Sequence, residues 1–331
     1  MKNNQEKKTW DRKKKEVQGE FSNLHNLQKH FSDEKVCREY LERFRWNGVP
    51  VCPYCKTEKV YRCKDGKNFK CGNRKECGKS FTATVGTFFE NIKIPLSKVF
   101  LAMYLITSDT KGVSSWQLSR FLGITQKSAW FLNHRIREML KAEAPEFLDN
   151  TVECDESLIG GKEKNKHKNK RIKHSQGRST AGKTPMFGIL ERKTENSPSK
   201  IHVEKVPNVT RETLQTIINE KVKRTASICT DEWLAYRGLD DRFKHFVVNH
   251  SQGLYVDGDA HTNSIENFWS ILKRGIHGTY HQVSEKHLDR YLTEFSGRFN
   301  TRNDSDATRF NLVLAKCTGR LTYKDLIAPA K

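Results

Sequence analysis

The stretch that decides the fold is Thr151-Val152-Glu153-Cys154-Asp155. Its composition predicts a short strand that ends in an acid. A second stretch of the same kind is Ala226-Ser227-Ile228-Cys229-Thr230-Asp231. The two stretches therefore predict a pair of strands, each with an aspartate at its carboxyl end.

The residues around these strands predict an alternation of further strands and helices. Strands are expected at 186–190, 201–206 and 245–248, and a helix is expected after the cap residue Thr210. This order is typical of an RNase H-like α/β domain, in which helices flank a mixed sheet and the first and fourth strands are neighbours. Asp155 and Asp231 would then meet at one end of the sheet, although 75 residues separate them.

The last predicted helix, residues 262–275, has one polar face. At about 100° per residue, Asn263, Glu266 and Lys273 fall within about 80° of one another. The apolar residues occupy the other side, namely Ile265, Phe268, Trp269, Ile271 and Leu272. A polar stripe is usually only solvated, but this one carries a carboxylate and an amide that follow two strand-end acids. We therefore expect it to face a site of chemistry.

Three carboxylates on a rigid scaffold can hold two Mg²⁺ or Mn²⁺ ions about 4 Å apart. The candidates are Asp155, Asp231 and Glu266. One ion would activate water or a DNA 3′-hydroxyl, and the other would stabilise the leaving oxygen of a phosphoryl displacement. Lys273, two turns after Glu266, is placed to contact a phosphate near the scissile bond.

Four of the nine cysteines have the spacing of metal ligands, namely Cys52, Cys55, Cys71 and Cys77. The first pair forms a CxxC knuckle, whereas five residues separate the two thiols of the second pair. Zn²⁺ bound by four thiolates has no open position, so we expect a structural zinc ribbon. Cys63 is an alternative ligand. Cysteines buried as small apolar side chains are the alternative to any metal site.

Between residues 95 and 140 the apolar periodicity is helical. Gly123 separates segments 114–122 and 124–132, and their apolar ridges can face each other as in a helix-turn-helix. Thr125 is a suitable cap for the second helix, whose first residues would lie where base edges are contacted. An ordinary two-helix corner with a glycine turn is the alternative interpretation.

The composition favours a polyanionic partner. The 331 residues include 60 Lys and Arg against 39 Asp and Glu, which leaves a net charge of +21. Nine Lys or Arg and one acid fall within residues 162–183, which predicts a basic loop that cannot form core. The longest apolar stretch, 99–106, is too short to span a bilayer, and residues 1–20 lack the apolar region of a secretory signal. We therefore expect no membrane partner.

With these residues in place, the sequence resembles DDE transposases of bacterial insertion sequences. It is most similar to the zinc-ribbon, ISXO-like group related to Merlin elements, over residues 51–302. The resemblance is carried chiefly by His261-Thr262-Asn263-Ser264-Ile265-Glu266-Asn267-Phe268-Trp269-Ser270-Ile271-Leu272-Lys273-Arg274-Gly275. Shorter matches are Asp155-Glu156 before Ile159-Gly160-Gly161, the triplet Thr230-Asp231-Glu232, and Arg298-Phe299-Asn300.

The resemblance implies a transposase that cleaves and joins DNA with divalent metal ions in an RNase H-like core. Asp155 and Asp231 carry over as the first two acids. Glu266 is the favoured third ligand, and Asn263 competes with it because some relatives are described with asparagine in that role. The implied partners are double-stranded DNA, as terminal inverted repeats and as target, and further copies of the chain in a dimer or higher oligomer on that DNA. The implied location is the bacterial cytoplasm, at the nucleoid.

Two other functions fit parts of the sequence. A zinc-ribbon transcription regulator with a degenerate catalytic domain would only bind DNA, but all three acids and Lys273 are present. A tyrosine recombinase would use His134-Arg135-Ile136-Arg137 with Tyr280 as its nucleophile. That short motif falls inside the helices that are expected to contact DNA.

These patterns predict five segments. They are a basic, partly helical N-terminal segment (1–45), a zinc ribbon (46–90), a helix-turn-helix module (91–148), an RNase H-like catalytic domain (149–303) with the basic loop 162–183, and a C-terminal tail (304–331).

Overall fold

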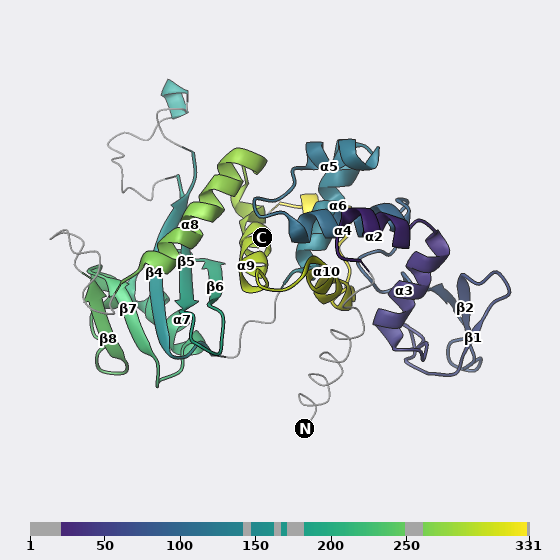
Figure 1. Cartoon of the computed structure of the whole chain (residues 1–331), viewed down its shortest axis with the longest axis horizontal. Helices are drawn as coiled ribbons and strands as arrows, with labels where there is room; N and C mark the ends of the chain where they lie inside the picture. The colour runs from purple at the N-terminus through teal and green to yellow at the C-terminus, as the bar shows by residue number, and fades with distance from the viewer. Residues whose placement is uncertain (1–20, 142–146, 162–166, 171–181, 249–260, 330–331) are drawn as a thin grey trace. The chain divides into compact units, whose positions relative to one another are not determined.

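A computed structural model describes residues 21–141, 147–161, 167–170, 182–248 and 261–329 (Figure 1). The chain forms two compact units. Met1–Leu140 and Asp304–Lys331 belong to the first, and Lys141–Asn303 forms the second. In the described part of the chain, no helix is long and apolar enough to cross a membrane.

The first unit is mainly helical. Among its described residues the helices are α2 (Leu24–His30), α3 (Glu34–Trp46), α4 (Leu96–Ser108), α5 (Ser115–Leu122), α6 (Gln126–Met139), α10 (Asp306–Ala315) and α11 (Tyr323–Ile327). The rings of Phe31, Phe100 and Phe310 contact one another in its core. Phe310 lies on α10, so the segment beyond residue 304, which we expected to be a tail, contributes to this core.

A small antiparallel sheet follows α3 in the same unit. Its strands are β1 (Val60–Arg62), β2 (Asn68–Cys71) and β3 (Ser80–Thr82), in the order β1-β2-β3. The rings of Phe69 and Phe81 stack with centroids 5.6 Å apart. Trp46, the last residue of α3, meets Phe69 edge-on at 5.1 Å. These three rings therefore join the sheet to the helix before it.

Helices α5 and α6 lie on either side of Gly123, where the sequence predicted two helical segments joined by a glycine turn. Gly123 ends α5 in the left-handed conformation (φ 59°), which glycine adopts at little cost. The side chain of Thr125 accepts a hydrogen bond of 3.2 Å from the backbone N–H of Ser128 and so caps α6. Leu118 and Leu132 are buried on the facing sides. The turn residues therefore set where one helix ends and the next begins.

The second unit contains a five-stranded mixed sheet. Its strands are β4 (Thr151–Ile159), β5 (Thr184–Glu191), β6 (Lys200–Lys205), β7 (Ser227–Asp231) and β8 (Lys244–Val248). They lie in the order β6-β5-β4-β7-β8. β4, β5 and β6 are antiparallel neighbours, whereas β4, β7 and β8 run parallel. The first and fourth strands in sequence are thus side by side, as expected.

Helices cover both faces of this sheet, as Figure 1 shows. A hydrophobic core lies on each face of the sheet, and the side chains of β5 alternate between the two cores. Phe187 lies in the core that contains residues of α7 (Arg211–Lys221), and Met186 lies in the core on the other face. The second core contains α8 (Asn263–Gly275) and α9 (Leu288–Asn300). The described residues of this unit also include four short helical turns, at Lys168–Lys170, Leu234–Tyr236, Ile276–Tyr280 and Glu285–His287.

Strand β4 is longer than we predicted. We expected it to end at Asp155, but its antiparallel pairing with β5 continues to Ile159. Parallel pairing with β7 covers only Thr151 to Glu153. Asp155 therefore lies inside the strand, just beyond its paired stretch with β7, because β5 supplies backbone partners for the remaining residues.

Candidate active site

Two parallel neighbouring strands carry the first two predicted acids. Glu153 of β4 pairs with Cys229 of β7 in the parallel ladder. Continued by two residues beyond the paired stretch, this register would place Asp155 beside Asp231, whose negative charge acts on the carboxyl group of Asp155. Side chains alternate along a strand, so both aspartates share the face of Glu153. The sequence prediction that these two acids approach each other thus has a basis in the observed ladder.

A glycine allows α8 to approach Asp155 closely. Gly188 of β5 is the cross-strand partner of Asp155. A Cβ atom at Gly188 would lie 2.8 Å from Cζ2 of Trp269 and 3.0 Å from Cδ1 of Ile265, so a larger residue does not fit. The indole fills this space, and its Nε1–H donates a hydrogen bond of 3.0 Å to Oδ2 of Asp155.

A hollow of about 610 Å³ is formed by residues of β4 and α8 and the turn after α8. Its lining residues are Asp155, Glu156, Ser157, Glu266, Trp269, Ser270, Lys273, Arg274 and His277. Three of the predicted site residues, Asp155, Glu266 and Lys273, therefore share one cavity. Asp231 lines a different hollow of about 560 Å³, together with Glu232, Trp233 and His245 among others.

The carboxyl groups of Asp155 and Glu156 on β4 are held in a setting that disfavours their ionisation. Burial, then the negative charges of Glu156 and Asp231, raise the pKa of Asp155 to about 8. Burial likewise raises the pKa of Glu156 to about 7, although Tyr236 donates a hydrogen bond of 2.6 Å to it. A cation would reverse this balance, because it favours the charged form of each acid. The group is thus suited to binding a positive ion.

The competing third ligands lie on the first turn of α8. Glu266 is exposed, and its Oε1 accepts a hydrogen bond of 3.0 Å from the hydroxyl of Thr262. Asn263 is also exposed but does not line the hollow that contains Asp155. The position of Glu266 is therefore the more favourable of the two for sharing an ion with Asp155.

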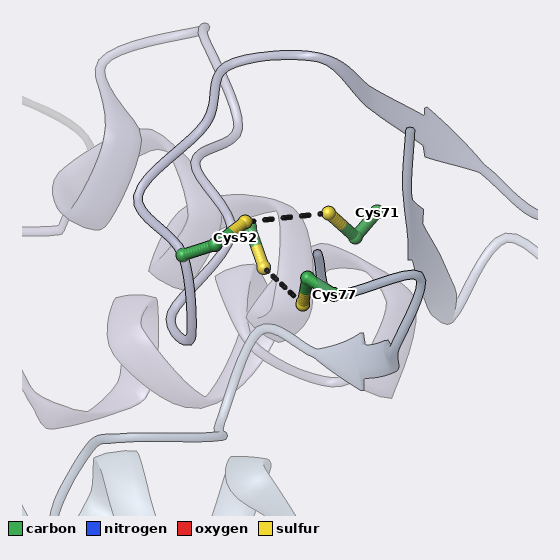
Figure 2. Close-up of side chains that lie close together, drawn as sticks. Cys52, Cys71 and Cys77 are labelled. Atoms are coloured by element: carbon green, nitrogen blue, oxygen red, sulfur yellow. Dashed lines mark hydrogen bonds between the residues drawn. The ribbon is translucent and has the colours of Figure 1, made fainter. Parts of the chain in front are cut away.

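The four predicted zinc ligands converge in the ribbon, and Figure 2 labels three of them, Cys52, Cys71 and Cys77. The sulfur atoms of Cys52, Cys55, Cys71 and Cys77 all lie within 4.8 Å of one another. Among the described residues this is the one group of three or more potential ligands that meets so closely, and it does not include Cys63 or the three acids. A Zn–S distance of about 2.3 Å gives a tetrahedral edge of about 3.8 Å. The Cys52–Cys77 and Cys55–Cys71 separations of 3.8 and 3.5 Å fit such an ion.

The long spacing of the second cysteine pair still gives a knuckle. A turn joins Cys71 to Cys77, and the N–H of Cys77 donates to the carbonyl of Asn73 at 3.0 Å. The residue after each second thiol, Lys56 or Gly78, has a positive φ, 62° and 58° respectively. Both loops therefore bend back after their second thiol. Four close cysteines in this fold support a structural Zn²⁺.

Sequence reasoning missed four residues around the acids. Trp269 bonds Asp155, and Glu153 bonds the first turn of α8. Arg192 bonds Glu153, and Gly188 lies against α8. We had counted Trp269 only as an apolar residue of its helix. The available signal was a charged residue, Glu153, within a strand whose neighbours Val152 and Cys154 are buried.

The residues of the recombinase alternative are each held by their own surroundings. His134 and Arg137 are buried in α6, with exposed fractions of 0 % and 1 %. The hydroxyl of Tyr280 donates a hydrogen bond of 2.5 Å to the buried carboxylate of Glu294. None of the three is thus presented as a reactive group. The basic stretch 162–183 lies largely outside the described residues.

Comparison with known families finds one match within each unit. A family model described as a transposase zinc-ribbon domain matches residues 32–80. A second, described as an ISXO2-like transposase domain of the DDE type, matches residues 147–300. The two domains together define a transposase of the insertion-sequence class.

Two relatives agree with these matches. An uncharacterized protein in transposable element ISH50 of Halobacterium salinarum is 29 % identical over 278 residues, which cover 82 % of this chain and 92 % of the relative. An uncharacterized transposase-like protein of Haemophilus influenzae is 37 % identical over 102 residues, which cover 30 % of this chain and 81 % of the relative. The chain belongs to the ISXO2-like transposase family. The resemblance drawn from the sequence is thereby confirmed.

Proposed function

We propose that this transposase cleaves and joins DNA at the ends of its element, with Asp155, Asp231 and Glu266 as ligands of two divalent cations in an RNase H-like domain. The proposal is supported chiefly by the approach of two acids on parallel neighbouring strands, β4 and β7, since the negative charge of Asp231 raises the pKa of Asp155. Glu266 lines the same hollow as Asp155 and supplies the third carboxylate. The order of the five strands supports the RNase H-like assignment.

Each side chain has a distinct part in this reaction. Asp155, Asp231 and Glu266 would hold Mg²⁺ or Mn²⁺, which would supply activation of the attacking hydroxyl and stabilisation of the leaving oxygen. Trp269 fixes one oxygen of Asp155 through its indole N–H and leaves the other for ligation. Lys273 lines the hollow with Arg274, so both can bind the phosphates that flank the scissile bond. Asn263 is the alternative ligand to Glu266.

We further propose that the first unit binds the terminal inverted repeats. Its ribbon and the α5–α6 corner, used as a helix-turn-helix, would position the DNA, and the basic stretch 162–183 would neutralise phosphates. Exposed Lys127 at the start of α6 supports this use of the corner. Joining two element ends requires two active sites, so we expect a dimer or higher oligomer on DNA. Its place of action would be the nucleoid.

Strand cleavage on a duplex with the element's own terminus tests the proposal. The wild-type chain with Mg²⁺ should nick the repeat, and Asp231→Ala should lose activity by orders of magnitude while its DNA affinity persists. Glu212→Ala, which removes an exposed carboxylate of α7, is the matched control and should cleave normally. Binding without cleavage by the wild-type chain would instead identify a regulator with an inactive domain.

A further inference from the structure

A second carboxylate of β4 lies in the core beside the proposed ligands. Glu153 precedes Asp155 by two residues, so both side chains leave the strand on the same face. The side chain of Glu153 is fully buried, with an exposed fraction of 0 %. A buried carboxylate is costly unless it is paired and hydrogen-bonded. The groups that surround Glu153 therefore indicate what it does.

Three groups surround the carboxylate of Glu153. Its Oε1 accepts a hydrogen bond of 2.6 Å from Nε of Arg192, the residue after β5, and lies 3.2 Å from Nδ1 of His261. Its Oε2 accepts a hydrogen bond of 2.9 Å from the backbone N–H of Ile265. Arg192 also donates to the carbonyl of His261 at 2.5 Å. These bonds join β4, the end of β5 and the start of α8 in one network.

This network replaces the usual cap of α8. The cap residue Thr262 does not accept a hydrogen bond from the first turn, and its hydroxyl donates to Glu266. The first turn donates instead, through Ile265, to Glu153, which lies 112 residues earlier in the chain. A negative charge at this end also suits the helix dipole. The start of α8 is thus fixed to β4, and Glu266 is the next residue along the helix.

We propose that Glu153 is a positioning residue, whose buried carboxylate holds the first turn of α8 on β4 and so sets Glu266 toward Asp155. The effect on cleavage rests on the proposed function; the effect on α8 does not. Buried ion pairs often add no more stability than apolar side chains of similar size. If Glu153 only filled space in the core, an apolar residue could therefore replace it. Holding the backbone N–H of Ile265, by contrast, requires a hydrogen-bond acceptor.

Amide hydrogen exchange over residues 263–269, in the full chain without DNA, tests the effect on α8. Glu153→Leu removes the acceptor of the Ile265 amide, so exchange in the first turn should become faster. Glu153→Gln keeps an acceptor oxygen and should restore slow exchange. Glu294→Leu is the matched control, because Glu294 is equally buried and paired with Arg298 but bonds Tyr280 instead of α8. It should leave this exchange unchanged.

The Mg²⁺ concentration for half-maximal cleavage is the second measurement. Loss of a residue that orients a metal ligand weakens metal binding by about 10- to 100-fold. Glu153→Leu should raise the half-maximal concentration by that factor, Glu153→Gln by less, and Glu294→Leu not at all. Unchanged exchange in Glu153→Leu overturns the proposal, and so does an equal Mg²⁺ shift in Glu294→Leu. If the wild-type chain cuts no DNA, the proposed function fails, and the exchange measurement alone decides the role of Glu153.

Discussion

The indole N–H of Trp269 on α8 donates a hydrogen bond of 3.0 Å to Asp155 on β4, across 114 residues of sequence. This bond joins the helix that carries Glu266 to the strand that carries the first acid. It also orients one oxygen of a carboxyl group that burial would otherwise leave poorly stabilised when ionised. The indole therefore links the geometry of the site to its protonation.

Replacing Trp269 by phenylalanine should shift the pH dependence of cleavage. The change keeps an aromatic ring in the core but removes the donor, which acts to lower the pKa of Asp155. That pKa should then rise further, and at a given pH fewer chains would have Asp155 ionised for metal binding, by about tenfold for each pKa unit. Single-turnover cleavage rates across pH would show a midpoint displaced upward. An unchanged profile would mean that the indole contributes only by filling space.

The raised pKa values predict how stability varies with pH. The pKa of Asp155 rises from 3.8 to about 8 and that of Glu156 from 4.5 to about 7. The folded chain therefore keeps protons that the unfolded chain releases, so these groups favour folding fully below about pH 4 and cease to do so as pH rises through about 8. In buffer without Mg²⁺, thermal unfolding should show declining stability over this range. Added Mg²⁺ should oppose the decline.

Asp155→Asn provides the comparison for this pH dependence. The amide cannot titrate, so the variant should lose less stability between about pH 5.5 and about pH 8 than the wild-type chain does. Equal pH dependence in the two chains would show that Asp155 does not have the raised pKa.

Gly188→Ala should disturb the contact between α8 and the sheet. The added methyl group would lie 2.8 Å from the indole of Trp269, inside a buried layer that has little room to adjust. Overpacking of this kind costs about 1–3 kcal/mol. Urea unfolding should report that loss, together with reduced cleavage. Gly161→Ala is the control, since a Cβ there has no neighbour within 4 Å, and its stability should match that of the wild-type chain.

Much of the fold could be predicted from local pattern. The starts of the two strands that carry Asp155 and Asp231, the polar face of α8 and the turn at Gly123 each depend on residues close in sequence, and the structure has them near the expected positions. The end of β4 was misjudged because it depends on its pairing with β5. The role of the C-terminal segment was missed for a similar reason, since Phe310 is buried by rings from distant helices.

The supporting residues of the candidate site were harder to predict. Glu153 bonds an amide 112 residues away, and Trp269 bonds an acid 114 residues away. Such pairs depend on strand register and helix placement, which one sequence without relatives does not specify. The cysteines were easier to identify, because the spacing of each knuckle is local and thiolates have a strong preference for Zn²⁺.

Purified protein should hold one Zn²⁺ per chain, and Cys77→Ser should lose it. The thiol of Cys77 lies 3.8 Å from that of Cys52, and without it the ion keeps three sulfur ligands. Because metal binding contributes directly to folding of such a domain, the ribbon should unfold and DNA binding should weaken. Metal analysis of the dialysed protein measures the loss. Cys63→Ser should keep its zinc, and full zinc in Cys77→Ser would refute the ligand assignment.

The third ligand can be identified by comparing Glu266→Ala with Asn263→Ala. Glu266 lines the hollow of Asp155, and its charged oxygen binds Mg²⁺ better than an amide does. Removing it should lower the cleavage rate by orders of magnitude, whereas removing Asn263 should cost much less. If the three acids act as one unit, adding Asp155→Ala to Glu266→Ala should lower the rate little further. DNA affinity measured in parallel should stay near wild type in every variant, because the acids repel phosphate and do not hold it. If Asn263→Ala lowered the cleavage rate more than Glu266→Ala does, the third ligand would be Asn263.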